Sequence, residues 1–307
     1  MNCIFGIDIG GTEIKIGKFY QKLLVLKTSI KTNLCDGGSH ILSDIFIKID
    51  ELTLGDTVEG IGIGVPGPVV DGVVLGAQNL NWKRLEAKRI LKERYPNCEI
   101  AILNDANSAA LGEMDQGGAK KYQNFVFLTI GTGIGGGIVI NGQLVEGATG
   151  SSGEIGHIRV AFENERLCTC GLYDCIEQYA SATGIVKTAN QLRVGRNTVL
   201  NTMEVTSKNI FDHAKLGDEV CLEVVAQMIE KLATATAAIA NIINPEAILI
   251  GGGVSKAGEF LLTRLQKRFR ELAFYSVRDT KFGLAELGND AGIYGDGFAV
   301  RKKIYGS

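Results

Sequence analysis

The sequence predicts an α/β protein of two domains, and two observations lead to that prediction. The chain has 307 residues, roughly twice the length of an average domain. Two segments, IDIGGTEIKIG from Ile7 and LTIGTGIGGGI from Leu128, each have the pattern of a strand, a turn of glycine and threonine, and a second strand. Their similarity suggests duplicated halves that join near Gly117 and Gly118.

The first half alternates strands and helices as an α/β domain requires. Apolar or alternating runs predict strands, and apolar residues recurring every three or four positions predict helices. The expected strands are Ile4–Ile9, Glu13–Ile16, Leu23–Leu26, Ile61–Val65 and Ile100–Leu103. The expected helices are His40–Glu51, Lys83–Tyr95 and Ala106–Met114. The last of them follows directly on Asn104 and Asp105.

The second half starts the pattern again at Phe125. The expected strands are Phe125–Ile130, Gly137–Ile140, Gln143–Val145 and Ala247–Ile250. Asn141 and Gly142 predict a two-residue hairpin between the second and third of these strands. A long helix, Val220–Ile243, is expected to end at Asn244 and Pro245, and another to begin at Ser255.

Composition and charge exclude several classes of protein. Hydrophobic residues make up 45% and the net charge is −2, so we expect a soluble globular protein that binds neither nucleic acid nor an anionic membrane. Asp8 interrupts the apolar start where a secretory signal would be uncharged, and Leu232–Ile243 is too short to span a bilayer. An odd number of cysteines, seven, fits reduced thiols, and we expect a cytoplasmic protein.

The glycine turns predict phosphate binding. In the first, Gly10, Gly11 and Thr12 lie between Asp8 and Lys15, and the strand that follows excludes a Walker loop. Such a turn can present N–H groups and a hydroxyl to phosphate oxygens, while Asp8 holds Mg²⁺ through water. An ordinary glycine hairpin is an equal alternative for one turn alone.

A second and a third glycine element strengthen the phosphate hypothesis. Gly131, Thr132 and Gly133 form the equivalent turn of the second half, so the two turns could grip a polyphosphate from opposite sides of a cleft. Gly252 and Gly253 follow a predicted strand, where a flat base such as adenine would meet no side chain. A plain strand-to-helix turn explains the third element equally well.

Two further groups of residues suggest chemistry. Asp105 lies at a strand end and a helix start, so it could be a general base in a cleft or merely the cap of the helix. His157 with Cys168, Cys170 and Cys175 has the composition of a closed structural zinc site, and three thiols without metal are the alternative.

A series of ordered motifs spans residue 4 to about residue 297 and resembles the ROK family of sugar kinases and repressors, its bacterial glucokinases most of all. The motifs are GIDIGGTEIK, GVPGPV, NLNW, NDANSAALGE, TIGTGIGGGIVINGQLVEG, GEIGH, CTCGLYDCIEQYAS, INPEAILIGGGVSKAGE and LGNDAGIYG. The resemblance implies the actin-like ATPase (ribonuclease H-like) fold, with duplicated βββαβα units around a central cleft. The domains would be 1–117 and 118–290, with about 291–307 packing back on the first.

The resemblance also implies an ATP-dependent hexose kinase. Asp105 would accept the proton of the 6-hydroxyl of glucose, and the sugar contacts would be Gly67, Asn81, Asn104, Glu154, His157 and Glu177. The nucleotide contacts, with Mg²⁺, would be Asp8, Gly10, Gly11, Thr12, Lys15, Thr132, Gly133, Gly252 and Gly253. Zinc on the four His and Cys ligands would fix His157 and Glu177. The family usually has glycine before the last cysteine, and Asp174 there puts the local turn in doubt.

Several alternatives to glucose phosphorylation stay open. N-acetylmannosamine, fructose and allose kinases share most of these residues. A repressor needs a DNA-binding module ahead of the first strand, which is expected to begin near residue 4, so that role is disfavoured. A catalytically silent sugar sensor is disfavoured by the joint presence of Asp8, Lys15, Asp105 and both turns. By analogy with the family we expect a homodimer or homotetramer.

Overall fold

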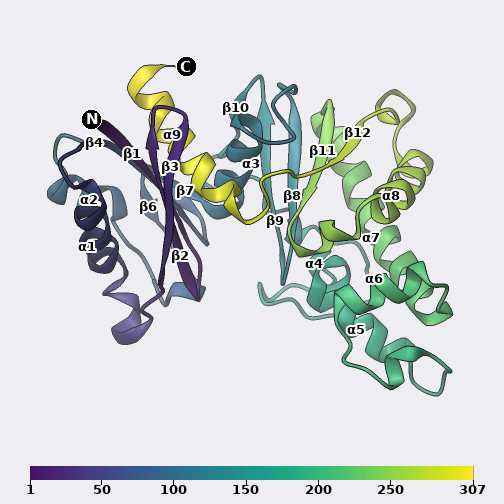
Figure 1. Ribbon diagram of the computed structural model, residues 1–307. Coiled ribbons are helices and arrows are strands. Elements are labelled where there is room, and N and C mark those ends of the chain that lie inside the picture. The colour runs from purple at the N-terminus through teal and green to yellow at the C-terminus, as the bar shows by residue number, and fades with distance from the viewer. Residues whose placement is uncertain (307) are drawn as a thin grey trace. The chain divides into compact units, whose positions relative to one another are not determined.

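A computed structural model describes residues 1–306 and divides the chain into two compact units (Figure 1). Unit 1 comprises Met1–Lys121, Leu144–Ser152 and the C-terminal segment from Leu287 onward. Unit 2 comprises Tyr122–Gln143 and Gly153–Glu286. The division differs from the boundary expected at residue 117, and it assigns residues 144–152 to unit 1 instead of the second domain.

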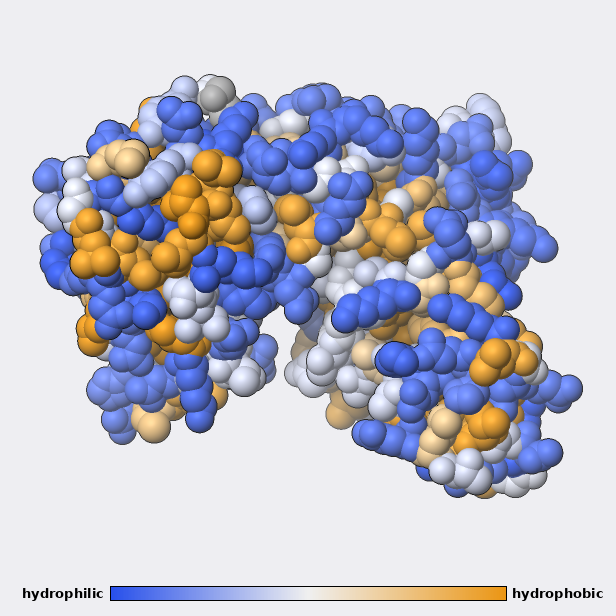
Figure 2. Space-filling model, in the orientation of Figure 1, coloured by the Kyte–Doolittle hydropathy of each residue, from blue (hydrophilic) through white to orange (hydrophobic). Residues whose placement is uncertain are grey.

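Unit 1 is built on a five-stranded sheet in the order β3-β2-β1-β4-β7. The strands are β1 (Asn2–Ile9), β2 (Glu13–Tyr20), β3 (Leu23–Lys31), β4 (Thr57–Val65) and β7 (Glu99–Asn104). The first three pair antiparallel, while β4 runs parallel to both β1 and β7. The register places Asp8 opposite Lys15 on β2 and Gly64 on β4. Figure 2 shows hydrophobic surface over the edge strand β3, where Leu23 and Val25 are exposed.

Four α-helices belong to unit 1. They are α1 (Ile41–Thr53), α2 (Ala87–Arg94), α3 (Asp105–Asp115) and α9 (Ala291–Tyr305). Helices α1 and α2 share one apolar cluster with the sheet, and α9 packs with Ile4, Phe19 and Ala101 in another. The start expected for α2 at Lys83 is wrong, because Leu85 exchanges two backbone hydrogen bonds with Val74 and is held extended.

Glycines let the backbone of α9 pack directly against the backbones of neighbouring elements. A Cβ atom on Gly295 would lie 1.7 Å from the Ser108 carbonyl oxygen of α3, and one on Gly62 of β4 would lie 2.0 Å from the Asp296 carbonyl oxygen. Gly6 of β1 faces the Ile293 carbonyl oxygen in the same way, at 2.1 Å. These glycines serve helix packing, which the phosphate interpretation of the glycine content did not foresee.

Unit 2 repeats the strand order of unit 1, as β10-β9-β8-β11-β12. The strands are β8 (Phe125–Ile130), β9 (Ile134–Ile140), β10 (Gln143–Leu144), β11 (Ala247–Gly251) and β12 (Lys281–Leu284). Strand β9 is antiparallel to β8, whereas β11 is parallel to β8 and β12. The duplication predicted from the sequence is confirmed. Strand β9 begins at Ile134 rather than Gly137, because Gly135 and Gly136 pair with β8.

The α-helices described for unit 2 share one apolar cluster with this sheet. They are α4 (Glu177–Ala180), α5 (Ala182–Leu192), α6 (Ser207–Lys215), α7 (Glu219–Ile243) and α8 (Glu259–Leu272). The helix expected from Ser255 is wrong, because Gly258, with φ +67°, separates a short 3-10 helix from α8. In residues 1–306, no helix combines the length and hydropathy of a membrane span.

Short elements connect these parts. Strands β5 (Val69–Val70) and β6 (Val73–Val74) form a separate hairpin. The 3-10 helices are η1 (Cys35–Gly38), η2 (Gln78–Leu80), η3 (Ile155–His157), η4 (Val199–Asn201), η5 (Gly253–Ala257), η6 (Tyr275–Val277) and η7 (Gly288–Asp290).

Candidate active site

The carboxyl end of β7 presents Asn104 and Asp105 at the start of α3. Asn104 is the cap of this helix, because its side-chain oxygen accepts from the backbone N–H groups of Ala106 (2.9 Å) and Asn107 (3.2 Å). Asp105 lies one residue further on and is exposed, and its carboxylate accepts from the N–H of Ala106. With the main capping bonds made by Asn104, an exposed carboxylate is left at the positive end of a helix, where its ionised form is favoured.

Gly67 and Asn81 come from two loops beside this strand end. The Asn104 side chain donates to the Gly67 carbonyl oxygen at 3.2 Å, which ties the first loop to the start of α3. Gly67 has φ +145°, and a Cβ atom there would lie 2.0 Å from the Gly76 carbonyl oxygen. Asn81, exposed and left-handed at φ +59°, ends η2, and its neighbour Trp82 is a buried anchor that donates to the Gly38 carbonyl oxygen.

The first glycine turn closes between β1 and β2. The N–H of Gly10 donates to the Glu13 carbonyl oxygen at 3.0 Å, and the Thr32 hydroxyl donates to the Gly10 carbonyl oxygen at 2.7 Å. Behind the turn, the Lys15 ammonium lies 3.4 Å from Asp8. Burial raises the pKa of the Asp8 carboxyl from its usual 3.8, and Lys15 works against that rise. The turn is therefore a braced backbone loop with a carboxylate and a cation side by side behind it.

Asp296, on α9, is a third carboxyl in this region, and the sequence interpretation missed it. Its side chain is fully buried and accepts from the Ser108 hydroxyl at 2.5 Å, and within residues 1–306 its second oxygen has no hydrogen-bond partner. Burial raises its pKa well above the usual 3.8, and the negative charges of Asp8 and Asp105 raise it further. Burial and these charges therefore favour the protonated form of Asp296. The available signal was a charged residue set among the glycines and apolar residues of the GIYGDG segment.

The second glycine turn, in unit 2, lies next to Glu177. A Cβ atom on Gly133 would lie 2.9 Å from Glu177 Oε2, so a larger residue there would displace this carboxylate. The Thr132 carbonyl oxygen accepts from the Thr183 hydroxyl at 3.0 Å, and the Gly131 carbonyl oxygen accepts from the Ala182 N–H at 2.8 Å. The start of α5 thus holds this turn, whereas a lysine and an aspartate flank the first.

His157, Cys168, Cys170 and Cys175 come together as the sequence predicts. Their ligand atoms all lie within 4.8 Å of one another, with 3.7 Å between the sulfurs of Cys170 and Cys175 and 3.6 Å between His157 Nδ1 and Cys168 Sγ. A tetrahedron with zinc–sulfur bonds of about 2.3 Å has edges of about 3.8 Å. The donor set therefore fits zinc, and these two pairs already have the spacing of tetrahedral edges.

The carboxylates near the cluster contact it directly. Cys168 Sγ donates to Glu177 Oε1 at 3.2 Å, and His157 Nε2 lies 3.9 Å from Glu154 Oε2. Burial raises the pKa of the Cys175 thiol to about 12, so this ligand is protonated at neutral pH until a metal displaces the proton. Glu177 is thus positioned from two sides, by the cluster and by the turn at Gly133.

Gly252 and Gly253 follow β11. Gly252 has φ +79°, and a Cβ atom there would lie 2.5 Å from the Ile130 carbonyl oxygen, so packing against β8 already requires glycine. A Cβ atom on Gly253 would meet nothing within 4 Å, and this position faces open space. Of the two, Gly253 fits the predicted role beside a flat ligand.

The structure groups the predicted residues by unit. Unit 1 holds Asp8, Gly10, Gly11, Thr12, Lys15, Gly67, Asn81, Asn104 and Asp105. Unit 2 holds Thr132, Gly133, Glu154, His157, Cys168, Cys170, Cys175, Glu177, Gly252 and Gly253. Direct contacts join Asn104 to Gly67, Asp8 to Lys15, and the cluster to Glu177.

Comparison with known proteins gives consistent matches along the chain. A ROK family model matches residues 4–303. A glucokinase of Halalkalibacterium halodurans is 39% identical over 97% of this chain and 94% of its own length, and a glucokinase of Thermotoga maritima is 32% identical over 99% and 98%. A crystal structure of a ROK family glucokinase from Streptomyces griseus, in complex with glucose and AMPPNP, aligns with a TM-score of 0.80 at 32% identity, over 98% of this chain and 99% of that one. The predicted actin-like ATPase fold is confirmed.

Proposed function

The chain belongs to the ROK family, and we propose that it is an ATP-dependent glucokinase, which transfers the γ-phosphoryl group of ATP to the 6-hydroxyl of glucose. The observation that carries the proposal is the exposed carboxylate of Asp105 at the start of α3, with Asn104 beside it as cap. Full-length similarity to glucokinases supports the choice of substrate.

The step needs a proton acceptor and electrostatic stabilisation more than covalent chemistry. Asp105 takes the proton of the 6-hydroxyl of glucose. The hydroxyl oxygen attacks the γ-phosphorus of ATP, and the bond between that phosphorus and the departing ADP breaks. The backbone of the two glycine turns and Lys15 hold phosphate oxygens, and Asp8 fits the role of holding Mg²⁺ through water. Mg²⁺, when bound, neutralises the charge that builds on the phosphates.

Sugar recognition is the proposed task of Asn81, Asn104, Glu154, His157 and Glu177, with Gly67 beside them. Carboxylates accept hydrogen bonds from sugar hydroxyls, and such bonds discriminate strongly where water is excluded. Zinc on the His/Cys cluster would fix His157 and Glu177 in place. Stripping zinc with a chelator should raise the sugar KM, and an unchanged sugar affinity in protein that had bound zinc would remove this role.

The test is a coupled ADP-release assay with ATP and Mg²⁺ across glucose, N-acetylmannosamine, N-acetylglucosamine, fructose and allose, with a blank lacking sugar. We expect the highest kcat/KM for glucose. Preference for another sugar would keep the mechanism and reassign the substrate. No sugar-dependent ADP release from folded, zinc-loaded protein would overturn the kinase proposal. We also propose a cytoplasmic location, from the sequence, and a homodimer or homotetramer, by analogy with the family.

A further inference from the structure

Asp174, the residue before Cys175, occupies a backbone conformation that favours glycine. Its φ is +61°, in the left-handed region that aspartate adopts only at some cost. Its side chain is also fully buried, which is costly for a carboxylate without partners. Two unfavourable features at one residue imply a compensating interaction, and the surrounding loop supplies it.

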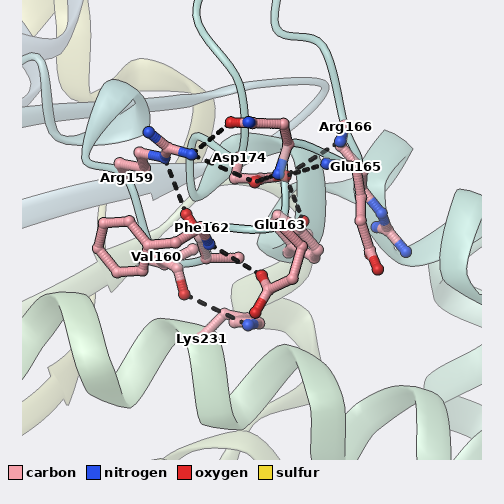
Figure 3. A network of polar contacts seen from close by, with 11 residues as sticks. Arg159, Val160, Phe162, Glu163, Glu165, Arg166, Asp174 and Lys231 are labelled. Carbon is pink, nitrogen blue, oxygen red and sulfur yellow. Dashed lines mark hydrogen bonds and ion pairs between the residues drawn. The ribbon is translucent and has the colours of Figure 1, made fainter.

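The Asp174 carboxylate accepts four hydrogen bonds (Figure 3). Its Oδ2 accepts from the backbone N–H of Asn164 at 2.8 Å. Its Oδ1 accepts from the N–H groups of Glu165 (3.1 Å) and Arg166 (3.0 Å) and from the Tyr179 hydroxyl (2.7 Å). Although burial acts to raise the pKa of Asp174, these donors lower it below the usual 3.8, so the group is a carboxylate at neutral pH.

Bonds from Asp174 also reach the segments that carry the cluster. The Asp174 backbone accepts from the N–H of Val160 at 3.0 Å and donates to the Arg166 carbonyl oxygen at 2.9 Å, and its carboxylate lies 3.9 Å from the Arg159 guanidinium. His157 is two residues from Arg159, Cys168 is two residues from Arg166, and Cys175 follows Asp174 itself. Asp174 therefore joins the three segments, through its backbone and through its buried carboxylate, and only the carboxylate bonds are lost when the side chain is removed.

The same network continues into α4, which begins with Glu177. The Arg166 guanidinium stacks on the Tyr179 ring at 4.3 Å and donates to the Gln178 carbonyl oxygen at 2.7 Å. Arg166 also donates to the Gln191 side chain at 2.8 Å. Tyr179 and Arg166 thus connect the Asp174 carboxylate to α4 through direct contacts.

We propose that the Asp174 carboxylate is a positioning residue that holds the His/Cys cluster in its metal-binding arrangement before the metal binds. The inference deepens the zinc site of the proposed function. A ligand set held in place loses less conformational entropy on binding, so the metal is bound more tightly and released more slowly. Glycine at this position would relieve the backbone strain and lose all four hydrogen bonds.

The first test measures zinc release to a chelator from zinc-loaded full-length protein. We expect Asp174→Gly to release zinc at least tenfold faster than wild type. Asp174→Asn keeps an acceptor oxygen and tolerates a left-handed backbone, so its rate should be intermediate. Release from Asp174→Gly at the wild-type rate would overturn the proposal.

Asp218→Gly is the matched control. The Asp218 carboxylate also caps backbone N–H groups in unit 2, those of Cys221 (2.9 Å) and Val199 (3.1 Å), and no bond joins it to the cluster. This variant should lower the melting temperature and leave the zinc release rate unchanged. Equal acceleration by both variants would show general destabilisation and overturn the proposal.

A second measurement uses metal-free protein and reports neither zinc binding nor activity. Cys170 is exposed, whereas Cys168 and Cys175 are 3% and 0% exposed. Thiol labelling read by mass spectrometry should therefore be slow at Cys168 and Cys175 in wild type and at least tenfold faster in Asp174→Gly. Labelling of Asp174→Gly at the wild-type rate would overturn the proposal. Failure of the wild-type protein to bind zinc would count against the zinc site alone, and the labelling comparison would still test the role of Asp174.

A milder variant covers the case in which Asp174→Gly does not fold. Tyr179→Phe removes one of the four hydrogen bonds and keeps the ring on which Arg166 stacks. Labelling of Cys168 and Cys175 should then rise severalfold. A rate equal to that of wild type would contradict the network.

Discussion

The two glycine turns occupy equivalent places in two sheets with the same strand order, yet different groups surround them. The turn of unit 1 has Asp8 and Lys15 behind it. The turn of unit 2 has Glu177 against Gly133, with the thiol of Cys168 as the next neighbour. Duplication therefore supplies two similar backbone positions, whereas the side chains around each turn differ between the units, with Asp8 and Lys15 in unit 1 and Glu177 in unit 2.

The helices that cover the two sheets also differ. In unit 1, α9 lies at backbone distance from α3, β1 and β4 because glycines line the contact. In unit 2, the long helix α7 contributes ordinary apolar side chains such as Val224, Met228 and Leu232 to the core. Unit 1 should therefore tolerate added side-chain volume far less well than unit 2.

Gly295→Ala should have the largest effect. The new Cβ atom would lie 1.7 Å from a backbone oxygen of α3, which cannot move aside, so we expect the free energy of unfolding to fall by about 3 kcal/mol or more. The control is Gly283→Ala in β12, where a Cβ atom meets nothing within 4 Å. Chemical denaturation checks both, and equal stability of the two variants would break the contrast between the units.

Asp296→Asn tests whether the buried acid of unit 1 is neutral. A carboxyl whose pKa is raised by burial contributes stability below its unfolded pKa, near 3.8, and loses that stability as pH rises toward its folded pKa. The free energy of unfolding of wild type, relative to that of the Asp296→Asn variant, should therefore fall as the pH rises above 4, with a slope of up to about 1.4 kcal/mol per pH unit. Denaturation between pH 4 and pH 8 measures it, and a pH-independent difference would show an ionised Asp296.

Lys15→Met should have a smaller effect, confined to the turn of unit 1. Without the cation, the pKa of the Asp8 carboxyl rises further, and one phosphate contact is lost. We expect the KM for MgATP to rise about tenfold. On acidification, the KM of the variant should begin to increase at a higher pH than the KM of wild type. Lys27→Met, which removes only an ion pair with Asp290, is the control. An unchanged KM would separate Lys15 from nucleotide binding.

Local patterns predicted much of the fold. Alternation and glycine turns located β1, β2 and β8, and the repeat of IDIGGT in TIGTG indicated two equivalent sheets. The start of α2 was wrong because Leu85 pairs with Val74, a tertiary contact that no helical periodicity reveals. The start of β9 was placed too late because the glycines at 135 and 136 have strand partners only in the folded sheet.

The candidate site was predicted in parts, and its supporting groups were not. The grouping of the four His and Cys residues was predicted because their residue types are those of zinc sites and their spacing in the chain is tight. Asp296 was missed because its significance lies in a burial that only the packing of α9 creates. Asp174 was noticed as a departure from glycine, and its four hydrogen-bond donors lie up to ten residues away in the chain. Such roles depend on tertiary neighbours, which one sequence does not display.

Turnover of Asp105→Asn with saturating glucose and MgATP tests the claim that Asp105 is the general base of a sugar kinase. We expect a loss of about 10²- to 10⁴-fold in kcat with a folded protein. Asp44→Asn removes the same charge from the first turn of another helix, α1, and should keep wild-type turnover. Near wild-type turnover in Asp105→Asn would contradict the claim.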